Sequence, residues 1–450
     1  MTLFANLRYL INQLITMKTT KIIILFGALS FSLLVSAQQA WTLQQCIDTA
    51  LVNNRNVKQK VLSRKISEIN YQQSKQDLLP NLNASAGQYY NFGRSLAADN
   101  VYRNTNSSQT SFGLSSNITL FDGLKMKYNI DARKAELNAS EADLKKMQSD
   151  LVMSVSTAFL QVLLNKELLQ IAKDQHDLTM SKIEQRKVLV SAGKMAEGEI
   201  YELIAQESKE EMNRVKAEQS LNYSLLDLSQ ILEIQNFETF DVVVPKDLLN
   251  SDLQLLNPQT VYDGALIHRP EIKSAEFRLQ SSEKNIQIAK SNYYPSLSLG
   301  AQTGSRYYNM SGVPNDAFSK QMSNNLSTSV GLNLSIPIFN KFEVKNGVRT
   351  AVIRAQSSKL DVENTKLELR KTIQQAYQNA LAAKARWDAA VKSEVASREA
   401  YRFSNQKYEN GRATVYELYQ AKSNLTQVLS EQTQAKYEYV FRIKILEWLK

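Results

Sequence analysis

Side chains that commonly carry enzymatic chemistry are few in this chain of 450 residues. The two histidines, His176 and His268, and the single cysteine, Cys46, lie in unrelated stretches. The serines lack a plausible histidine partner, and the sequence contains neither a metal-ligand cluster nor a phosphate-binding glycine loop. We therefore expect no catalytic residue, no metal site and no cofactor.

Two acidic residues lie at more informative places. Glu199 and Glu417 each follow a glycine by six positions, and these glycines, Gly193 and Gly411, are 218 positions apart. Both glycines separate two helical patterns, and Thr414 is placed to cap the second helix of its pair. The acids fit the positive end of a helix dipole. If several copies met on one axis, the acids would instead form a ring that attracts cations.

The formal net charge of +10 does not indicate a nucleic-acid partner. Its 54 basic residues interleave with 44 acidic ones along helical patterns, which is typical of a solvated helix surface. Only 43% of the residues are hydrophobic, so we expect thin walls of amphipathic helix rather than a thick core.

Residues 1–37 are expected to be a signal peptide, with Met17 a candidate for the true start. From Met17 to Ala37 a basic start, an apolar run and the small-residue end Val-Ser-Ala follow one another. Cleavage is expected before Gln38. We expect neither a lipid anchor at Cys46 nor another stretch apolar enough for a transmembrane helix.

The mature chain is expected to contain two structural repeats, residues 38–235 and 259–450, joined by a linker at 236–258. Each begins with a short helix and a polar helix, and each continues with a β-hairpin, a long helix and a return helix. The hairpins are expected at about 81–121 and 296–339, with polar loops at 95–107 and 310–325. The long helices are expected to end near residues 190 and 410, with coiled-coil spacing of their apolar residues.

The strands of both hairpins alternate apolar side chains with small or polar ones. The residues expected to face lipid are Phe112, Leu114, Ile118, Leu120, Val330, Leu332, Leu334 and Ile336. Four strands cannot close a barrel and would leave two edges unpaired in lipid. Several copies that each donate four strands to one barrel would remove these edges.

Seven motifs in order give the mature chain a resemblance to a known family. They are WTLQQCIDTAL, LLPNLNAS, LFDG, HRPEIKSAE, YYPSLSLG, IFN and YENGRATVYEL. With them the chain resembles the TolC-like outer-membrane efflux protein family. The resemblance implies a mixed α and β membrane protein, mostly α. Its homotrimer would form a 12-stranded transmembrane β-barrel that continues into a coiled-coil α-helical barrel in the periplasm.

The resemblance also implies roles for residues at the two tips. Glu417 falls on the family's acidic ring at the periplasmic aperture, whereas Gln420 replaces a second acid. Tyr408 and Glu199 fall on two positions that are linked to each other in the family's closed state. In the family an arginine also joins this link; its position is occupied by Ala413 here, and Arg412 lies next to it. Docking of an adaptor is expected at the exposed turns, which comprise Ala192, Gly193, Lys194, Asn410, Gly411 and Arg412.

The function implied is a passive exit duct in the outer membrane, part of a tripartite efflux pump or a type I secretion system. Its partners would be a periplasmic adaptor protein, an inner-membrane transporter of the RND, ABC or MFS type, and outer-membrane lipid. The alternative is a soluble periplasmic coiled-coil scaffold without a pore. The sequence does not name a transported substrate.

Overall fold

The structure, a computed structural model, describes residues 40–450 except 97–99, 105, 195, 236–238 and 246–254. The expected signal peptide lies outside the described residues. The described residues form two compact units. The tip unit contains those within Met1–Asn54, Asp150–Leu256 and Ala376–Trp448, and the strand unit those within Arg55–Ser149, Asn257–Gln375 and Leu449–Lys450.

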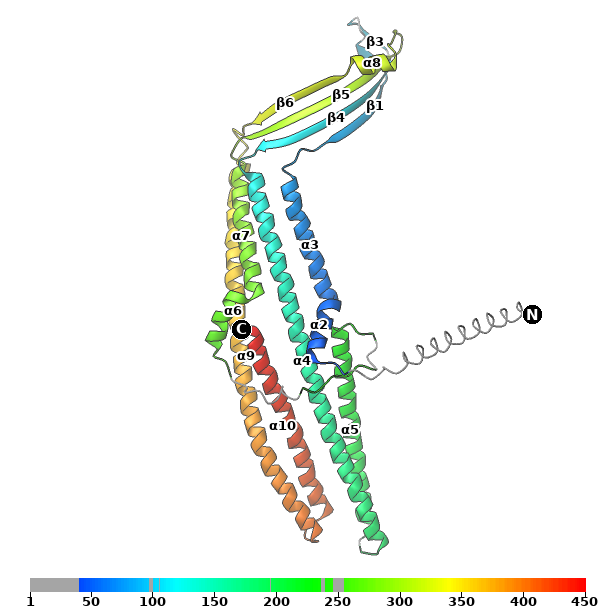
Figure 1. The fold of residues 1–450 in the computed structure, drawn as a ribbon, viewed down its shortest axis with the longest axis vertical. Helices are drawn as coiled ribbons and strands as arrows, with labels where there is room; N and C mark the ends of the chain where they lie inside the picture. The colour runs from blue at the N-terminus through cyan, green and yellow to red at the C-terminus, as the bar shows by residue number, and fades with distance from the viewer. Residues whose placement is uncertain (1–39, 97–99, 105, 195, 236–238, 246–254) are drawn as a thin grey trace, which may run out of the picture. The chain divides into compact units, whose positions relative to one another are not determined.

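Helices dominate the described part of the chain (Figure 1). In chain order they are α2 (Leu43–Asn53), α3 (Arg55–Gln76), α4 (Lys125–Ser191), α5 (Gly198–Ile231), α6 (Pro258–His268), α7 (Pro270–Ser291), α8 (Phe318–Asn324), α9 (Glu343–Glu409) and α10 (Val415–Leu449). The long helices α4 and α9 have 67 residues each, so each is about 100 Å long. The two short helices α2 and α6 have 11 residues each, and α3 and α7 have 22 each.

One of these helices is apolar enough to cross a membrane by length and composition. An 18-residue window of α4 has a mean hydropathy of 1.3, and 39% of that window is buried within the protein. We expected no stretch after the signal peptide to be apolar enough for a transmembrane helix, and this expectation is therefore wrong. Val155 and Phe159 of α4 are fully buried, as is typical of a helix that packs in a protein core.

The strand unit contains a four-stranded antiparallel sheet, with β1 and β6 as its edge strands (Figure 1). Its strands in spatial order are β1 (Asn83–Asn91), β4 (Ser107–Phe121), β5 (Ser296–Met310) and β6 (Ser327–Ser335). The two hairpins therefore pair through β4 and β5.

One face of this sheet carries most of its large apolar side chains, and the other carries mainly small and polar side chains. Leu332 pairs with Leu299, which pairs in turn with Ile118, and directly paired residues lie on the same face of a sheet. Phe112, Leu114, Val330 and Leu334 belong to this apolar face by the same register. The opposite face carries Gly113, Ser115, Asn117, Gly300, Gln302, Gly331 and Asn333.

Three details differ from the sequence-based expectation. The polar stretches expected to be loops contain a short ribbon, β2 (Arg94–Leu96) with β3 (Tyr102–Asn104), and the helix α8, because short polar elements have no apolar alternation to reveal them. Ile336 lies beyond the end of β6, since Pro337 follows it and has no N–H for a sheet hydrogen bond. Leu120 lies at a bulge, where Phe121 pairs with Leu297.

Candidate functional site at the helical tips

The turns at Gly193 and Gly411 have the same backbone geometry. Their φ angles are +70° and +69°, values that favour glycine over residues with a Cβ. The N–H groups of Gly193 and Lys194 donate to the carbonyls of Val190 and Leu189, both at 2.9 Å. Around Gly411 the same two hydrogen bonds recur, at 3.0 and 2.8 Å. Each long helix therefore ends in a Schellman motif, which turns the chain sharply at its tip.

The six turn residues expected to dock an adaptor are exposed within the chain. They are Ala192, Gly193, Lys194, Asn410, Gly411 and Arg412. Small and polar side chains leave the backbone of both turns accessible, so another helical hairpin could approach them end to end.

Tyr408 and Glu199, the pair implied by the family resemblance, are in contact. The Tyr408 hydroxyl at the end of α9 donates a hydrogen bond of 3.1 Å to Glu199 Oε2 in the first turn of α5. Partial burial and the adjacent Glu199 carboxylate raise the pKa of Tyr408 to about 12, so the hydroxyl keeps its proton at neutral pH. The contact joins the second hairpin to the first.

An apolar cluster supports this contact from the side. Ile183, Leu203, Val415 and Tyr419 are buried together, and Tyr408 packs against them. These residues come from α4, α5 and α10, so all three helices meet directly above the two turns. The cluster fixes the position of the Tyr408 ring and limits the directions in which its hydroxyl can point.

The cation beside Tyr408 is Arg186, which the sequence analysis missed. Its guanidinium lies 4.7 Å from the centre of the Tyr408 ring, within the range of a cation–π contact. Arg412, the neighbour of the position where the family has its arginine, is exposed at the turn. Arg186 is one helical turn from Ile183 of the apolar cluster, but sequence spacing alone does not tell which ring it covers.

Glu417 and Gln420 lie on one exposed side of α10. With Ser397, Ala400, Tyr416, Ala421 and Asn424 they line a shallow groove of about 310 Å³. Glu417 also caps its own helix. Its carboxylate accepts a hydrogen bond of 2.8 Å from the Thr414 N–H, and its own N–H donates to the Thr414 hydroxyl at 3.2 Å. Thr414 therefore caps α10, as the sequence predicted, and Glu417 completes the cap.

Two lysines that the sequence analysis did not single out lie inside the tip unit. Lys182 Nζ donates to Asn405 Oδ1 at 2.9 Å and to the Tyr401 hydroxyl at 3.3 Å, and burial lowers the pKa of this lysine. Lys422 is 2% exposed. It follows Leu418 by four positions and precedes Leu425 by three, so its place on the apolar stripe of α10 was a detectable signal.

Comparison with known proteins identifies the family. A sequence model of the "Outer membrane efflux protein" family matches residues 46–232 and 261–442, which is most of the chain. The chain belongs to the outer membrane efflux protein family. The motifs that carried the resemblance in the sequence are therefore those of a true family member.

Relatives of this outer membrane efflux protein are distant in sequence but alike in fold. It is 21% identical to the outer membrane protein TolC of Salmonella enteritidis, over 94% of this chain and 84% of that protein. It is 26% identical to the probable outer membrane lipoprotein SilC of Salmonella typhimurium, over 70% of this chain and 65% of that protein. A crystal structure of a membrane protein from Pseudomonas aeruginosa matches with a TM-score of 0.75 at 20% identity, over 92% of this chain and 93% of that chain.

This outer membrane efflux protein is a channel protein of the outer membrane with most of its chain in the periplasm, and it is not an enzyme. The described residues include no group of three or more His, Cys, Asp or Glu side chains that could hold a metal ion. Cys46 is fully buried, and burial raises the pKa of its thiol to about 12, so this thiol is unreactive. His176 contacts Glu207 of α5 at 3.0 Å, which makes it a link between α4 and α5.

Proposed function

We propose that this outer membrane efflux protein acts as a homotrimer whose three four-stranded sheets close one 12-stranded barrel in the outer membrane. The one-sided apolar sheet is the observation that carries the proposal. Val330, Leu332 and Leu334 are 59–68% exposed in the single chain, and they lie on the face that lipid would cover. The edge strands β1 and β6 have nine residues each, so β6 of one copy matches β1 of the next in length.

The proposed architecture also includes an internal repeat. Residues 38–235 and 259–450 would be two copies of one unit, joined by the linker 236–258. The matched lengths of α4 with α9 and of α5 with α10 support this proposal. Twelve long helical segments from three chains would then form the wall of a hollow coiled-coil cylinder.

In this assembly the protein serves as a passive exit duct of a tripartite efflux pump or a type I secretion system. An adaptor would dock on the exposed turns at Gly193 and Gly411, and an inner-membrane transporter of the RND, ABC or MFS type would supply the energy. The small and polar face of the sheet would line the pore, which suits a duct with little selectivity of its own. A soluble scaffold without a pore would instead leave the apolar face of the sheet in water.

The proposed aperture is a ring of Glu417 with Gln420 beside it, and Tyr408 with Glu199 and Arg186 holds it closed. Three copies of Glu417 on one axis would attract cations and repel each other. Because the second acidic position of the family is Gln420 here, this ring carries less charge. Glu417 caps α10 as well, and the two roles are compatible because Glu417 remains exposed while it makes the capping contact.

Substitution of Glu417 by glutamine separates the aperture from the cap. Glutamine keeps an oxygen that can accept the Thr414 N–H hydrogen bond and removes the charge. We expect Glu417→Gln trimers in planar bilayers to lose most of the cation preference of the wild type while their melting temperature stays the same. Glu431→Ala, which removes the charge of an exposed acid further along α10, is the control. An unchanged cation preference in Glu417→Gln would show that Glu417 is only a cap.

A further inference from the structure

A buried ion pair joins three helices of the tip unit at a point where the family resemblance implied no contact. Lys422 Nζ on α10 donates to Glu210 Oε1 on α5 at 3.0 Å and to the Gln175 carbonyl on α4 at 3.0 Å. A third hydrogen bond joins it to the Thr179 hydroxyl of α4. The three ammonium protons therefore have three acceptors.

The carboxylate of this pair also has several hydrogen-bond donors. Glu210 Oε1 also accepts from Gln206 Nε2 at 3.0 Å, and Oε2 accepts from the Thr179 hydroxyl. The side chains of Lys422 and Glu210 are 2% and 10% exposed within a single chain. Removing one partner of such a pair leaves the other charge buried and uncompensated, which is far more costly than losing a surface ion pair.

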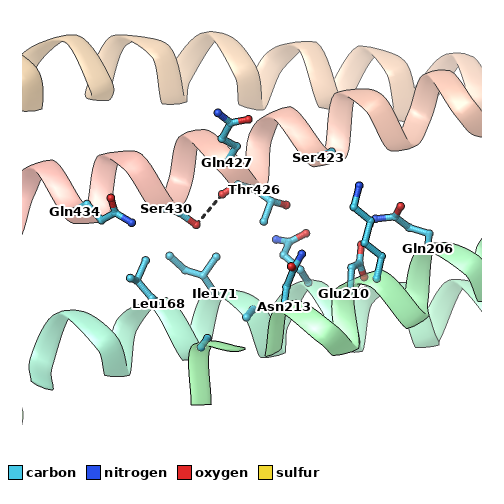
Figure 2. A pocket seen from close by; sticks show the side chains of 14 residues that line it. Leu168, Ile171, Gln206, Glu210, Asn213, Ser423, Thr426, Gln427, Ser430 and Gln434 are labelled. Atoms are coloured by element: carbon cyan, nitrogen blue, oxygen red, sulfur yellow. Dashed lines mark hydrogen bonds between the residues drawn. The ribbon is translucent and has the colours of Figure 1, made fainter. Parts of the chain in front are cut away.

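Direct packing between these helices is interrupted next to the pair. A cavity of about 330 Å³ lies between α10 on one side and α4 with α5 on the other, as Figure 2 shows. Its lining is mixed: Leu168 and Ile171 of α4 are apolar, whereas Gln206 and Asn213 of α5 and Thr426 and Gln427 of α10 are polar. Beside this cavity the ion pair attaches α10 to both α5, through Glu210, and α4, through the Gln175 carbonyl.

Lys422 is also close to the proposed aperture along the same helix. It follows Glu417 by five positions, so a displacement of α10 at Lys422 moves Glu417 with it. Between them Leu418 and Tyr419 hold α10 in the buried core. The ion pair therefore acts on the helix that carries the aperture acid and not on the acid itself.

We propose that Lys422, Glu210, Thr179 and the Gln175 carbonyl form a buried latch, which holds α10 against the α4–α5 hairpin and thereby keeps the aperture narrow. The proposal rests on the proposed channel function. In it Lys422 is a positioning residue for Glu417, distinct from the contact between Tyr408 and Glu199. A partner that opens the tip would have to separate the latch or swing α4, α5 and α10 together as one body.

The test compares purified trimers in planar bilayers without adaptor or transporter. We expect Lys422→Met to raise the open probability about tenfold or more. The free energy that corresponds to a tenfold change is smaller than the free-energy cost of breaking a buried ion pair. Lys422→Met combined with Glu210→Gln keeps similar volumes and leaves no unpaired charge. We expect this double variant to melt near the wild-type temperature and still to open more often. Lys209→Met, which removes the same charge from an exposed neighbour of Glu210, should behave like the wild type.

The outcomes separate the latch from the channel. The latch is overturned if the wild type conducts and the double variant has the same open probability as the wild type. This holds even if Lys422→Met is unstable or leaky, because the leak would then come from the unpaired Glu210 alone. A wild type that conducts no ions overturns the channel function, and the latch with it. Raised opening in the double variant with an unchanged melting temperature supports the latch, since a merely structural role would alter stability and leave the opening of a folded variant unchanged.

Discussion

Glu199 and Glu417 occupy equivalent positions after their glycines, but their carboxylates have different partners. Glu199 accepts a hydrogen bond from Tyr408 of the other hairpin, whereas Glu417 caps its own helix through Thr414. One acid therefore joins two hairpins, and the other remains exposed for the proposed aperture. Equivalent sequence positions need not have equivalent roles, because each role depends on which helix lies opposite.

Tyr408→Phe tests the contact with Glu199 at the level of one atom. The substitution keeps the ring that packs on the apolar cluster and under Arg186, and it removes only the hydroxyl. A hydrogen bond to a charged group contributes about 1.5–3 kcal/mol, so we expect the open probability in planar bilayers to rise about tenfold. Tyr201→Phe is a matched control, because the Tyr201 hydroxyl donates to Glu197 at 3.4 Å on the exposed surface of α5. Equal opening in both variants would contradict a closing role for Tyr408.

Among the elements, those with a strong period were predictable and those set by tertiary contacts were not. The long helices and the sheet faces follow from apolar spacing, and both tips follow from a glycine in the left-handed conformation. The end of β6 was misplaced because alternation continues through Ile336, although Pro337 ends the pairing. Arg186 and Lys422 could not be assigned partners, since their contacts join helices far apart in the sequence.

Two glycine substitutions with opposite expected effects test the tip geometry. Gly411→Ala forces a Cβ into a φ of +69°, so we expect the closed tip to lose about 1 kcal/mol and the melting temperature in detergent to fall. Gly347→Ala lies inside α9, where an added Cβ meets nothing within 4 Å in the chain, so we expect a gain of about 0.5–1 kcal/mol. A drop in melting temperature for Gly347→Ala as large as that for Gly411→Ala would argue against the assigned turn.

For the molecule as a whole, the sheet is the part that cannot be stable alone in a membrane. Its apolar face needs lipid, and its two edge strands need partners. The helices alone would also fit a soluble bundle. The outer-membrane location is therefore known from the family, and the apolar face of the sheet is the physical reason for it. In the proposed trimer the apolar face contacts lipid, and each edge strand pairs with an edge strand of a neighbouring copy.

Lysine substitutions on the two faces of β6 test which side contacts lipid. Leu332→Lys places a charge on the apolar face, at a cost of about 2–4 kcal/mol near the bilayer midplane. We expect this variant to be depleted from the outer-membrane fraction. Asn333→Lys introduces the same charge at the next position, on the opposite face, and should still insert. Equal depletion of both variants would contradict the assignment of the faces.

The molar mass of the detergent-extracted mature protein, measured by light scattering with the detergent contribution subtracted, tests the central claim most directly. The proposed 12-stranded barrel, with four strands from each chain, predicts three chains per particle. A particle of one chain, or of any number other than three, would contradict the proposed channel.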